Sequence, residues 1–138
     1  MKLRIDHINL TVNNLDESTL WYQKVFGFEV LESGSKGLGS AWKIVGRDDT
    51  MICMTEYSGR EAPYSYDLSP RHQINHFGLR IEDREQWEDI VKKNKLTLKY
   101  GGLVEYPKSL SWYITDPNGH EVEVNYSFNQ ALSFPHAK

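Results

Sequence analysis

Apolar and polar residues alternate along two short segments of the chain, IDHINLTV (Ile5–Val12) and INHFGLRI (Ile74–Ile81). Alternation with a period of two is typical of a β-strand with one buried face, so we expect a strand in each place. The third residue of each segment is a histidine, and the offset from His7 to His76 is half of the 138-residue chain. A repeat at half the chain length predicts two copies of one supersecondary unit.

The segments after each of these strands follow the same order in both halves. In the first half the pattern predicts a helix, a strand, a glycine-rich loop and two more strands, at about Asp16–Phe26, Phe28–Glu32, Ser33–Gly39, Ala41–Val45 and Met51–Tyr57. In the second half it predicts a helix, a short strand and a hairpin around the turn sequence DPNG, at Asp83–Asn94, Leu96–Leu98, Ser111–Thr115 and Glu121–Tyr126.

We therefore expect one α+β domain, residues 1–138, in which two pseudo-symmetric βαβββ modules form a cleft-shaped mixed sheet. Module one spans residues 1–57, a polar linker spans 58–71, module two spans 72–126 and a tail spans 127–138. A chain of this length buries enough apolar surface for one compact domain. The linker is long enough to join the modules within one chain or to carry one module onto a neighbouring subunit.

Composition and charge narrow the range of functions and partners that the chain can have. Hydrophobic residues make up 39% and charged residues 25% of the chain, as in ordinary globular proteins. The formal net charge of −3 and the pI near 5.9 argue against nucleic acid or an anionic membrane as a partner. The sequence contains no long apolar run, and the single Cys53 excludes an intramolecular disulfide. We expect a cytoplasmic protein with a small-molecule substrate.

The polar faces of the predicted strands carry the candidate chemistry. His7 shares its face with Asn9, and His76 lies on the corresponding face of the second copy. In the last strand, HEVEVNY, the valines take the core side, so Glu121 and Glu123 take the polar side. His7, His76 and Glu123 together supply two imidazoles and one carboxylate, a set that suits a divalent metal with open coordination positions. Glu121 is expected to be a solvated neighbour of Glu123.

Three features of the chain point to a known family: the segments DHINLTV and NHFGLRI, the paired module order and the stretch YITDPNGHEVEV. In these features the chain resembles the vicinal oxygen chelate superfamily over nearly its whole length. That superfamily comprises glyoxalases, extradiol dioxygenases, fosfomycin-resistance enzymes, epimerases and bleomycin-resistance proteins. Its final hairpin carries a metal-binding glutamate seven residues after the turn aspartate, which corresponds to Glu123 after Asp116. The resemblance implies that His7, His76 and Glu123 hold Fe²⁺, Mn²⁺, Zn²⁺ or Ni²⁺, and it favours a homodimer.

The resemblance leaves the number of metal ligands open. Glyoxalases and epimerases usually take a fourth ligand from the last strand of module one, which here is MICMTEY. The register that we favour aligns Ile52 with Val122, puts Cys53 in the place of Glu123 and turns Glu56 to the opposite face. A slip of one residue would instead turn Glu56 into the cleft. The favoured register gives three ligands, as in ring-cleaving dioxygenases and fosfomycin-resistance enzymes.

The same comparison names the candidate catalytic residues, Tyr113 and Glu123. Extradiol dioxygenases place a tyrosine before the hairpin turn, where Tyr113 stands, but the histidine that they usually carry earlier is missing from Lys99–Leu110. Lys108, Ser109 and Ser111 are candidates for holding a phosphonate, as in fosfomycin-type enzymes. The candidate cleft-lining residues are Asn9, Trp42, Cys53, Glu56 and Trp112.

The leading hypothesis is a metalloenzyme whose substrate chelates the metal through two neighbouring oxygens, so that the metal stabilises an enolate or a bound oxygen intermediate. Glyoxalase-like lyase or isomerase chemistry and ring cleavage by a dioxygenase are both compatible with this set. The alternative is a metal-free protein of the bleomycin-resistance type that sequesters a small molecule, and the ligand set counts against it. A degenerate regulatory module is a third hypothesis.

Overall fold

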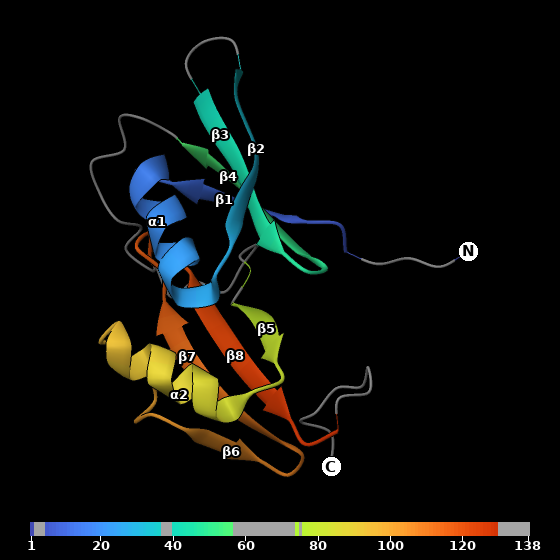
Figure 1. Ribbon diagram of the computed structural model, residues 1–138, viewed down its shortest axis with the longest axis vertical. Helices are drawn as coiled ribbons and strands as arrows, with labels where there is room; N and C mark the ends of the chain where they lie inside the picture. Colours follow the sequence, from blue (N-terminus) through green and yellow to red (C-terminus); the bar gives the residue numbers. More distant parts are fainter. Residues whose placement is uncertain (2–4, 37–39, 57–73, 75, 130–138) are drawn as a thin grey trace. The chain divides into compact units, whose positions relative to one another are not determined.

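A computed structural model describes residues 1, 5–36, 40–56, 74 and 76–129 (Figure 1). The chain divides into two compact units, Met1–Asp67 and Leu68–Lys138. The described residues of each unit form one helix and one four-stranded mixed sheet in the order βαβββ, which confirms the α+β class and the repeat. The predicted linker and all of the predicted tail beyond Asn129 lie outside the described residues.

The first unit is a sheet in the order β1-β4-β3-β2 with one helix against it. Its elements are β1 (Ile8–Val12), α1 (Leu15–Phe26), β2 (Glu29–Lys36), β3 (Ser40–Arg47) and β4 (Thr50–Glu56). The first and last strands pair in parallel, and the other pairs are antiparallel. Because β1 starts at Ile8, His7 lies one residue before the strand and not within it.

The ends of α1 are encoded by the residues around it. The Asn14 side chain accepts a hydrogen bond from the Glu17 backbone N–H, which satisfies one of the helix's free donors. At the other end Gly27 has a left-handed backbone (φ 67°), and its N–H bonds back to the carbonyl of Gln23. Between these caps Tyr22 and Val25 are buried against the sheet.

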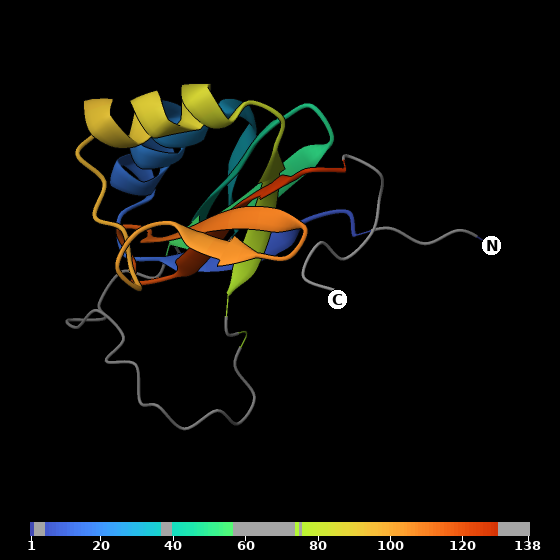
Figure 2. The ribbon, with the colours of Figure 1, turned by 90° about the horizontal axis from the view of Figure 1, so that it is seen from below.

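The second unit repeats this arrangement, with sheet order β5-β8-β7-β6 (Figure 2). Its elements are β5 (Phe77–Ile81), α2 (Arg84–Lys93), β6 (Val104–Tyr106), β7 (Ser109–Thr115) and β8 (Glu121–Ser127). Asp83 caps α2 by accepting a hydrogen bond from the Gln86 N–H. Residues Val122 and Val124 of β8 are fully buried, so the valines face the core as predicted.

The β7–β8 turn is held by one buried side chain. Asp116 Oδ1 accepts hydrogen bonds from the backbone N–H groups of Asn118 (2.9 Å) and His120 (2.8 Å). Its second oxygen, Oδ2, pairs with Nδ1 of His120 at 2.8 Å. These bonds confirm the DPNG turn.

Two sequence predictions are wrong. Residues 96–98 form no strand, because the chain leaves α2 through a left-handed Lys95 and turns again at Tyr100 and Gly101. The segment meets β7 at the next residue, where the Lys99 N–H donates to the Tyr113 carbonyl at 2.8 Å. The edge position of the sheet, beside β7, is taken by β6, after the glycines. The predicted loop Ser33–Gly39 is also too long, since β2 continues to Lys36, paired with β3.

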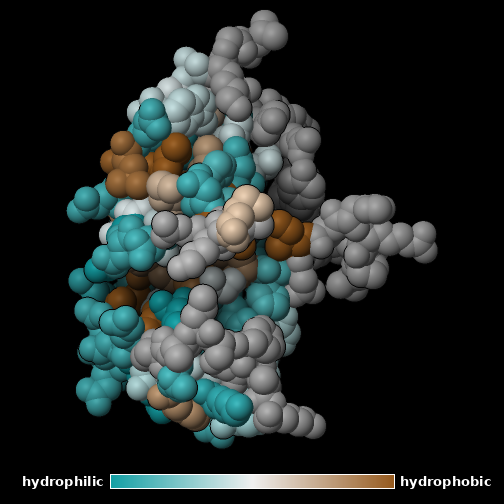
Figure 3. Space-filling model, turned by 90° about the vertical axis from the view of Figure 1, so that its right-hand side faces the viewer, coloured by the Kyte–Doolittle hydropathy of each residue, from teal (hydrophilic) through white to brown (hydrophobic). Residues whose placement is uncertain are grey.

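On the face shown in Figure 3, hydrophobic side chains form small groups among hydrophilic ones. Exposed apolar residues of the first unit include Leu20, Val30 and Leu31. None of the helices in the described part of the chain has the length and apolar character needed to cross a membrane.

Candidate metal centre

Strand pairing shows which residues of the first unit share a face with Asn9. Asn9 lies opposite Cys53, and Thr11 lies opposite Thr55, so all four side chains project from one face of the sheet. Thr55 Oγ1 donates to Asn9 Oδ1 at 3.1 Å. Asn9 and Cys53 thus lie on the polar face where the sequence predicted them.

Trp42 lies opposite Thr55 and shares that face. Its indole packs over the backbone of Gly34 in β2, because a Cβ at position 34 would stand 2.7 Å from the ring. The half-buried indole is therefore a wall of this face rather than a residue of the core.

His7 itself is held by its neighbour. Its Nδ1 pairs with Asp6 Oδ2 at 2.7 Å, and about half of the side chain is exposed. A carboxylate on one imidazole nitrogen fixes the ring so that the other nitrogen, Nε2, faces a ligand; this arrangement is common around metal-binding histidines. His7 belongs to the first unit, and its place in the ligand set stays a prediction.

Glu56 does not share the face of Asn9 and Cys53. It pairs with Val12 and lies on the side of Ile52 and Met54, and its Oε2 accepts a hydrogen bond from the Leu15 N–H at 2.7 Å. The carboxylate therefore caps the first turn of α1, where the helix dipole favours a negative charge. Glu56 is not a cleft-lining residue of this sheet.

The two units have the same register, which is the one favoured from sequence. Ile8 pairs with Ile52 in the first unit, and Phe77 pairs with Val122 in the second. Cys53 therefore occupies the position that corresponds to Glu123.

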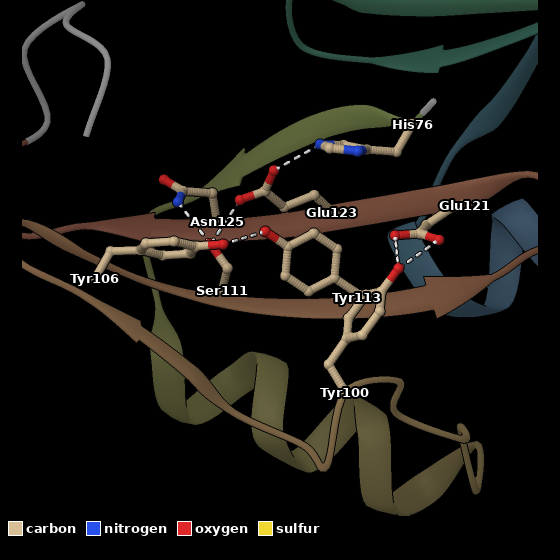
Figure 4. Close-up of polar contacts among 8 residues, drawn as sticks. All are labelled: His76, Tyr100, Tyr106, Ser111, Tyr113, Glu121, Glu123 and Asn125. Carbon is tan, nitrogen blue, oxygen red and sulfur yellow. Dashed lines mark hydrogen bonds and ion pairs between the residues drawn. The ribbon is translucent and has the colours of Figure 1, made fainter. Parts of the chain in front are cut away.

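In the second unit, the structure brings His76 and Glu123 together (Figure 4). His76 Nε2 lies 3.0 Å from Glu123 Oε2. Glu123 comes from the middle of β8, next to Gly78 of β5, and only 10% of its side chain is exposed. Its other oxygen, Oε1, accepts a hydrogen bond from Ser111 Oγ at 2.7 Å. The carboxylate is thus held on one side, with the opposite oxygen directed to the histidine.

Nε2 of His76 and Oε2 of Glu123 are hydrogen-bonded to each other at 3.0 Å. Two ligands at right angles on an octahedral ion, each about 2.1 Å from it, also lie about 3.0 Å apart, so the distance is compatible with a divalent cation held by the same two atoms. Within the described part of the chain, no group of three His, Cys, Asp or Glu side chains stands ready to hold a metal, so the pair supplies two positions of an incomplete set.

Tyr113 lies beside this pair. It is paired with Glu123 across β7 and β8, and its ring meets the His76 ring edge-on at 5.7 Å. Its hydroxyl lies 2.8 Å from the hydroxyl of Tyr106. Burial raises the pKa of the Tyr113 phenol, and the Tyr106 hydroxyl and the Glu123 charge raise it further, so the phenol keeps its proton.

Glu121 is not the solvated neighbour that the sequence predicted. It is 7% exposed, and its carboxylate pairs with Lys99 and accepts a hydrogen bond from the Tyr100 hydroxyl at 2.9 Å. The hydrogen bond to Glu121 raises the pKa of Lys99 and that of Tyr100. The exposure of Glu121 was misjudged because its ion-pair partner, Lys99, lies 22 residues earlier in the chain, in a loop.

Trp112 also differs from expectation. It pairs with Val124, on the face opposite Tyr113, and is 3% exposed. It is a core residue and does not line the polar face. The sequence did not single out Tyr106. Ser111 was named only as a candidate for binding a phosphonate, and not as the residue that holds Glu123. The alternation of SLSWY in β7 could have placed Ser111 and Tyr113 on the same face of the strand.

Three comparisons with known proteins relate to this arrangement. Residues 4–124 match the family model of the glyoxalase/bleomycin resistance protein/dioxygenase superfamily. The metallothiol transferase FosB of Staphylococcus epidermidis is 26% identical over 127 residues, covering 88% of this chain and 80% of that protein.

Two solved structures have the same fold. A glyoxylase/bleomycin resistance protein/dioxygenase domain from Frankia sp. matches with a TM-score of 0.77 and 19% identity, over 92% of this chain and 99% of that one. The fosfomycin resistance protein FosX of Listeria monocytogenes, solved with Mn(II) and sulfate, matches with a TM-score of 0.67 and 21% identity, over 92% and 94% of the two chains.

Proposed function

Because the chain belongs to the glyoxalase/bleomycin resistance protein/dioxygenase superfamily, we propose that it is a divalent-metal-dependent enzyme. Its substrate is a small molecule that chelates the metal through two neighbouring oxygens. The observation that carries this proposal is the His76–Glu123 pair, with its ligand-like spacing of 3.0 Å and its buried, hydrogen-bonded carboxylate. FosX, a relative in fold, was solved with Mn(II), which supports a divalent metal here.

The proposed ligands are His7, His76 and Glu123, with Fe²⁺, Mn²⁺, Zn²⁺ or Ni²⁺ as the metal. His7 would complete the set from the first unit, where Asp6 fixes its ring. When bound, such a metal supplies Lewis-acid chemistry to a chelated substrate.

The side chains around Glu123 have separate tasks in this proposal. Ser111 holds Oε1, so that Oε2 is presented toward the position of the metal. Tyr113 offers a protonated hydroxyl, supported by Tyr106, to the substrate oxygens. The low exposure of Glu123 and Ser111 excludes bulk water, which strengthens each of these polar interactions.

The reaction type stays a prediction. Three protein ligands on an octahedral ion leave about three positions, enough for a bidentate substrate and one further group. Glyoxalase-like lyase or isomerase chemistry and dioxygenase chemistry both fit that count. FosB, named a metallothiol transferase, adds transfer of a thiol as a third reaction of the same kind of site. The competing proposal is a metal-free binding protein of the bleomycin-resistance type.

Metal analysis tests the proposal. Protein purified without a tag, then equilibrated with Mn²⁺ and passed through dilute chelator, should retain one metal per chain. His7→Ala, His76→Ala and Glu123→Ala should each lose most of it, whereas His72→Ala, four residues before His76, should not. Full metal content in all three variants would refute the ligand set, and a metal-free wild type would favour the binding protein.

We also propose a homodimer and a cytoplasmic location. A homodimer fits the family resemblance, and sedimentation of a strict monomer at micromolar concentration would contradict it without affecting the metal site. A cytoplasmic location fits the single cysteine, Cys53.

A further inference from the structure

One buried polar atom near Glu123 has no hydrogen-bond partner among the residues that the structure describes. Asn125 is 7% exposed, and no hydrogen-bond donor among the described residues reaches its side-chain oxygen Oδ1. A buried acceptor without a donor costs about 1–3 kcal/mol, so such atoms are rare and call for a ligand or an ordered water.

The orientation of this amide is fixed by its neighbours. Asn125 Nδ2 lies 2.9 Å from Ser111 Oγ, and Ser111 Oγ lies 2.7 Å from Glu123 Oε1. An ionised carboxylate only accepts, so the one hydroxyl proton of Ser111 goes to Glu123. Ser111 can then only accept from Asn125, which places the amino group at Ser111 and leaves Oδ1 as the unpaired end.

The unpaired oxygen lies on the face of the candidate metal centre. Glu123 and Asn125 are two residues apart on β8 and project from the same side of it (Figure 4), about 7 Å apart along the strand. Their neighbours on β5 are Gly78 and Arg80. Gly78 has no side chain, and a Cβ there would meet nothing closer than the Glu123 carbonyl at 3.9 Å. There is therefore room beside Glu123, and Arg80 does not donate to Oδ1.

We infer that Asn125 is a specificity-determining residue whose Oδ1 accepts a hydrogen bond from an N–H or O–H group of the metal-bound substrate. The inference rests on the proposed function. It narrows the substrate class to chelating molecules that carry a donor directly beside the two coordinating oxygens. A substrate without that donor would leave Oδ1 buried and unpaired, which is the basis of discrimination.

A pair of chelators that differ in one donor tests this inference. Acetohydroxamate binds metals through two neighbouring oxygens and keeps an N–H beside them, whereas N-methylacetohydroxamate has the same oxygens and no N–H. Their dissociation constants are measured by calorimetry on Mn²⁺-loaded protein whose metal content is known. The wild type should prefer acetohydroxamate by about tenfold, the value of one hydrogen bond.

Two variants show whether the difference in affinity comes from the hydrogen bond or from the bulk of the extra methyl group. Asn125→Leu keeps about the same side-chain volume and removes Oδ1 together with the Nδ2 bond to Ser111 Oγ. The preference between the two chelators should then fall to about twofold or less, while the Ser111–Glu123 bond remains and the metal stays bound. Ser127→Ala, which removes another buried polar group from the same face of β8, should keep the tenfold preference.

Each failure has its own meaning. Equal binding of the two chelators to metal-loaded wild type would overturn the inference and leave the proposed function intact. If Asn125→Leu kept the full preference for acetohydroxamate, the inference would also be overturned, because another residue would then accept the hydrogen bond from the N–H. Wild-type protein that retains no metal would overturn both.

Discussion

Replacing Glu56 with alanine should destabilise the protein without affecting its metal. Glu56 Oε2 accepts a hydrogen bond from the Leu15 N–H at 2.7 Å, and Leu15 is buried at the first position of α1. In Glu56→Ala this N–H loses its partner, and the helix dipole loses a compensating charge. The first loss costs about 1–3 kcal/mol and the second about 0.3–1 kcal/mol.

We expect a net loss of about 2 kcal/mol in the free energy of unfolding. A chain of 138 residues unfolds with an entropy near 0.29 kcal/mol/K, so the melting temperature should fall by about 7 °C. Glu56→Gln keeps an acceptor and loses only the charge, so its loss should be about 0.5 kcal/mol. Thermal unfolding by circular dichroism measures both variants.

The control is Asn14→Ala, which removes the other side-chain cap of the same helix end. It should cost about 1 kcal/mol and also leave the metal affinity unchanged. Titration with Mn²⁺ and X-ray absorption report the affinity and the coordination number. A tenfold loss of metal affinity in Glu56→Gln, with one oxygen ligand fewer and an unchanged melting temperature, would refute the capping role and make Glu56 a fourth ligand.

Two more predictions concern the second unit. Ser111→Ala removes the hydrogen bond that holds Glu123 Oε1, so the Mn²⁺ affinity, measured by competition with a chelator, should fall about tenfold; an unchanged affinity would mean that Glu123 needs no such support. Asp116→Ala removes the acceptor of the N–H groups of Asn118 and His120. The free energy of unfolding, measured with urea, should fall by about 3 kcal/mol. A fall of less than about 1 kcal/mol would contradict the holding role of Asp116 in this turn.

The sequence predicted features whose causes are local. The limits of α1 follow from Asn14 and Gly27, and the β7–β8 turn follows from Asp116 and the residues just after it. The repeat predicted the register as well, because a slip of one residue would have turned Ile52 and Met54 away from the core. The same alternation placed Glu123 on the polar face.

The errors concern contacts between residues far apart in the chain. Alternation identifies a polar face but not whether other residues cover it, so Glu121 was taken as solvated although Lys99 and Tyr100 enclose its carboxylate. The orientation of Ser111 toward Glu123 depends on a hairpin partner rather than on its own neighbours. The segment LTL has the composition of a strand, but it lies between the left-handed Lys95 and the turn at Tyr100 and Gly101 and forms none.

The parallel pairing of the first and last strands of each unit also affects the order of events during synthesis. In each unit the first strand pairs with the last, as β5 does with β8, and the antiparallel strands come between them in the chain. His76 and Glu123 are thus 47 residues apart in sequence, and they meet only when the whole unit has left the ribosome. Closing so long a loop is an entropic cost that is offset once β7 and β8 have formed a hairpin to receive β5. A nascent chain that stops before β8 would have a sheet without its parallel edge and a histidine without its carboxylate. In the proposed site, the metal would therefore bind to this pair only after β5 has paired with β8.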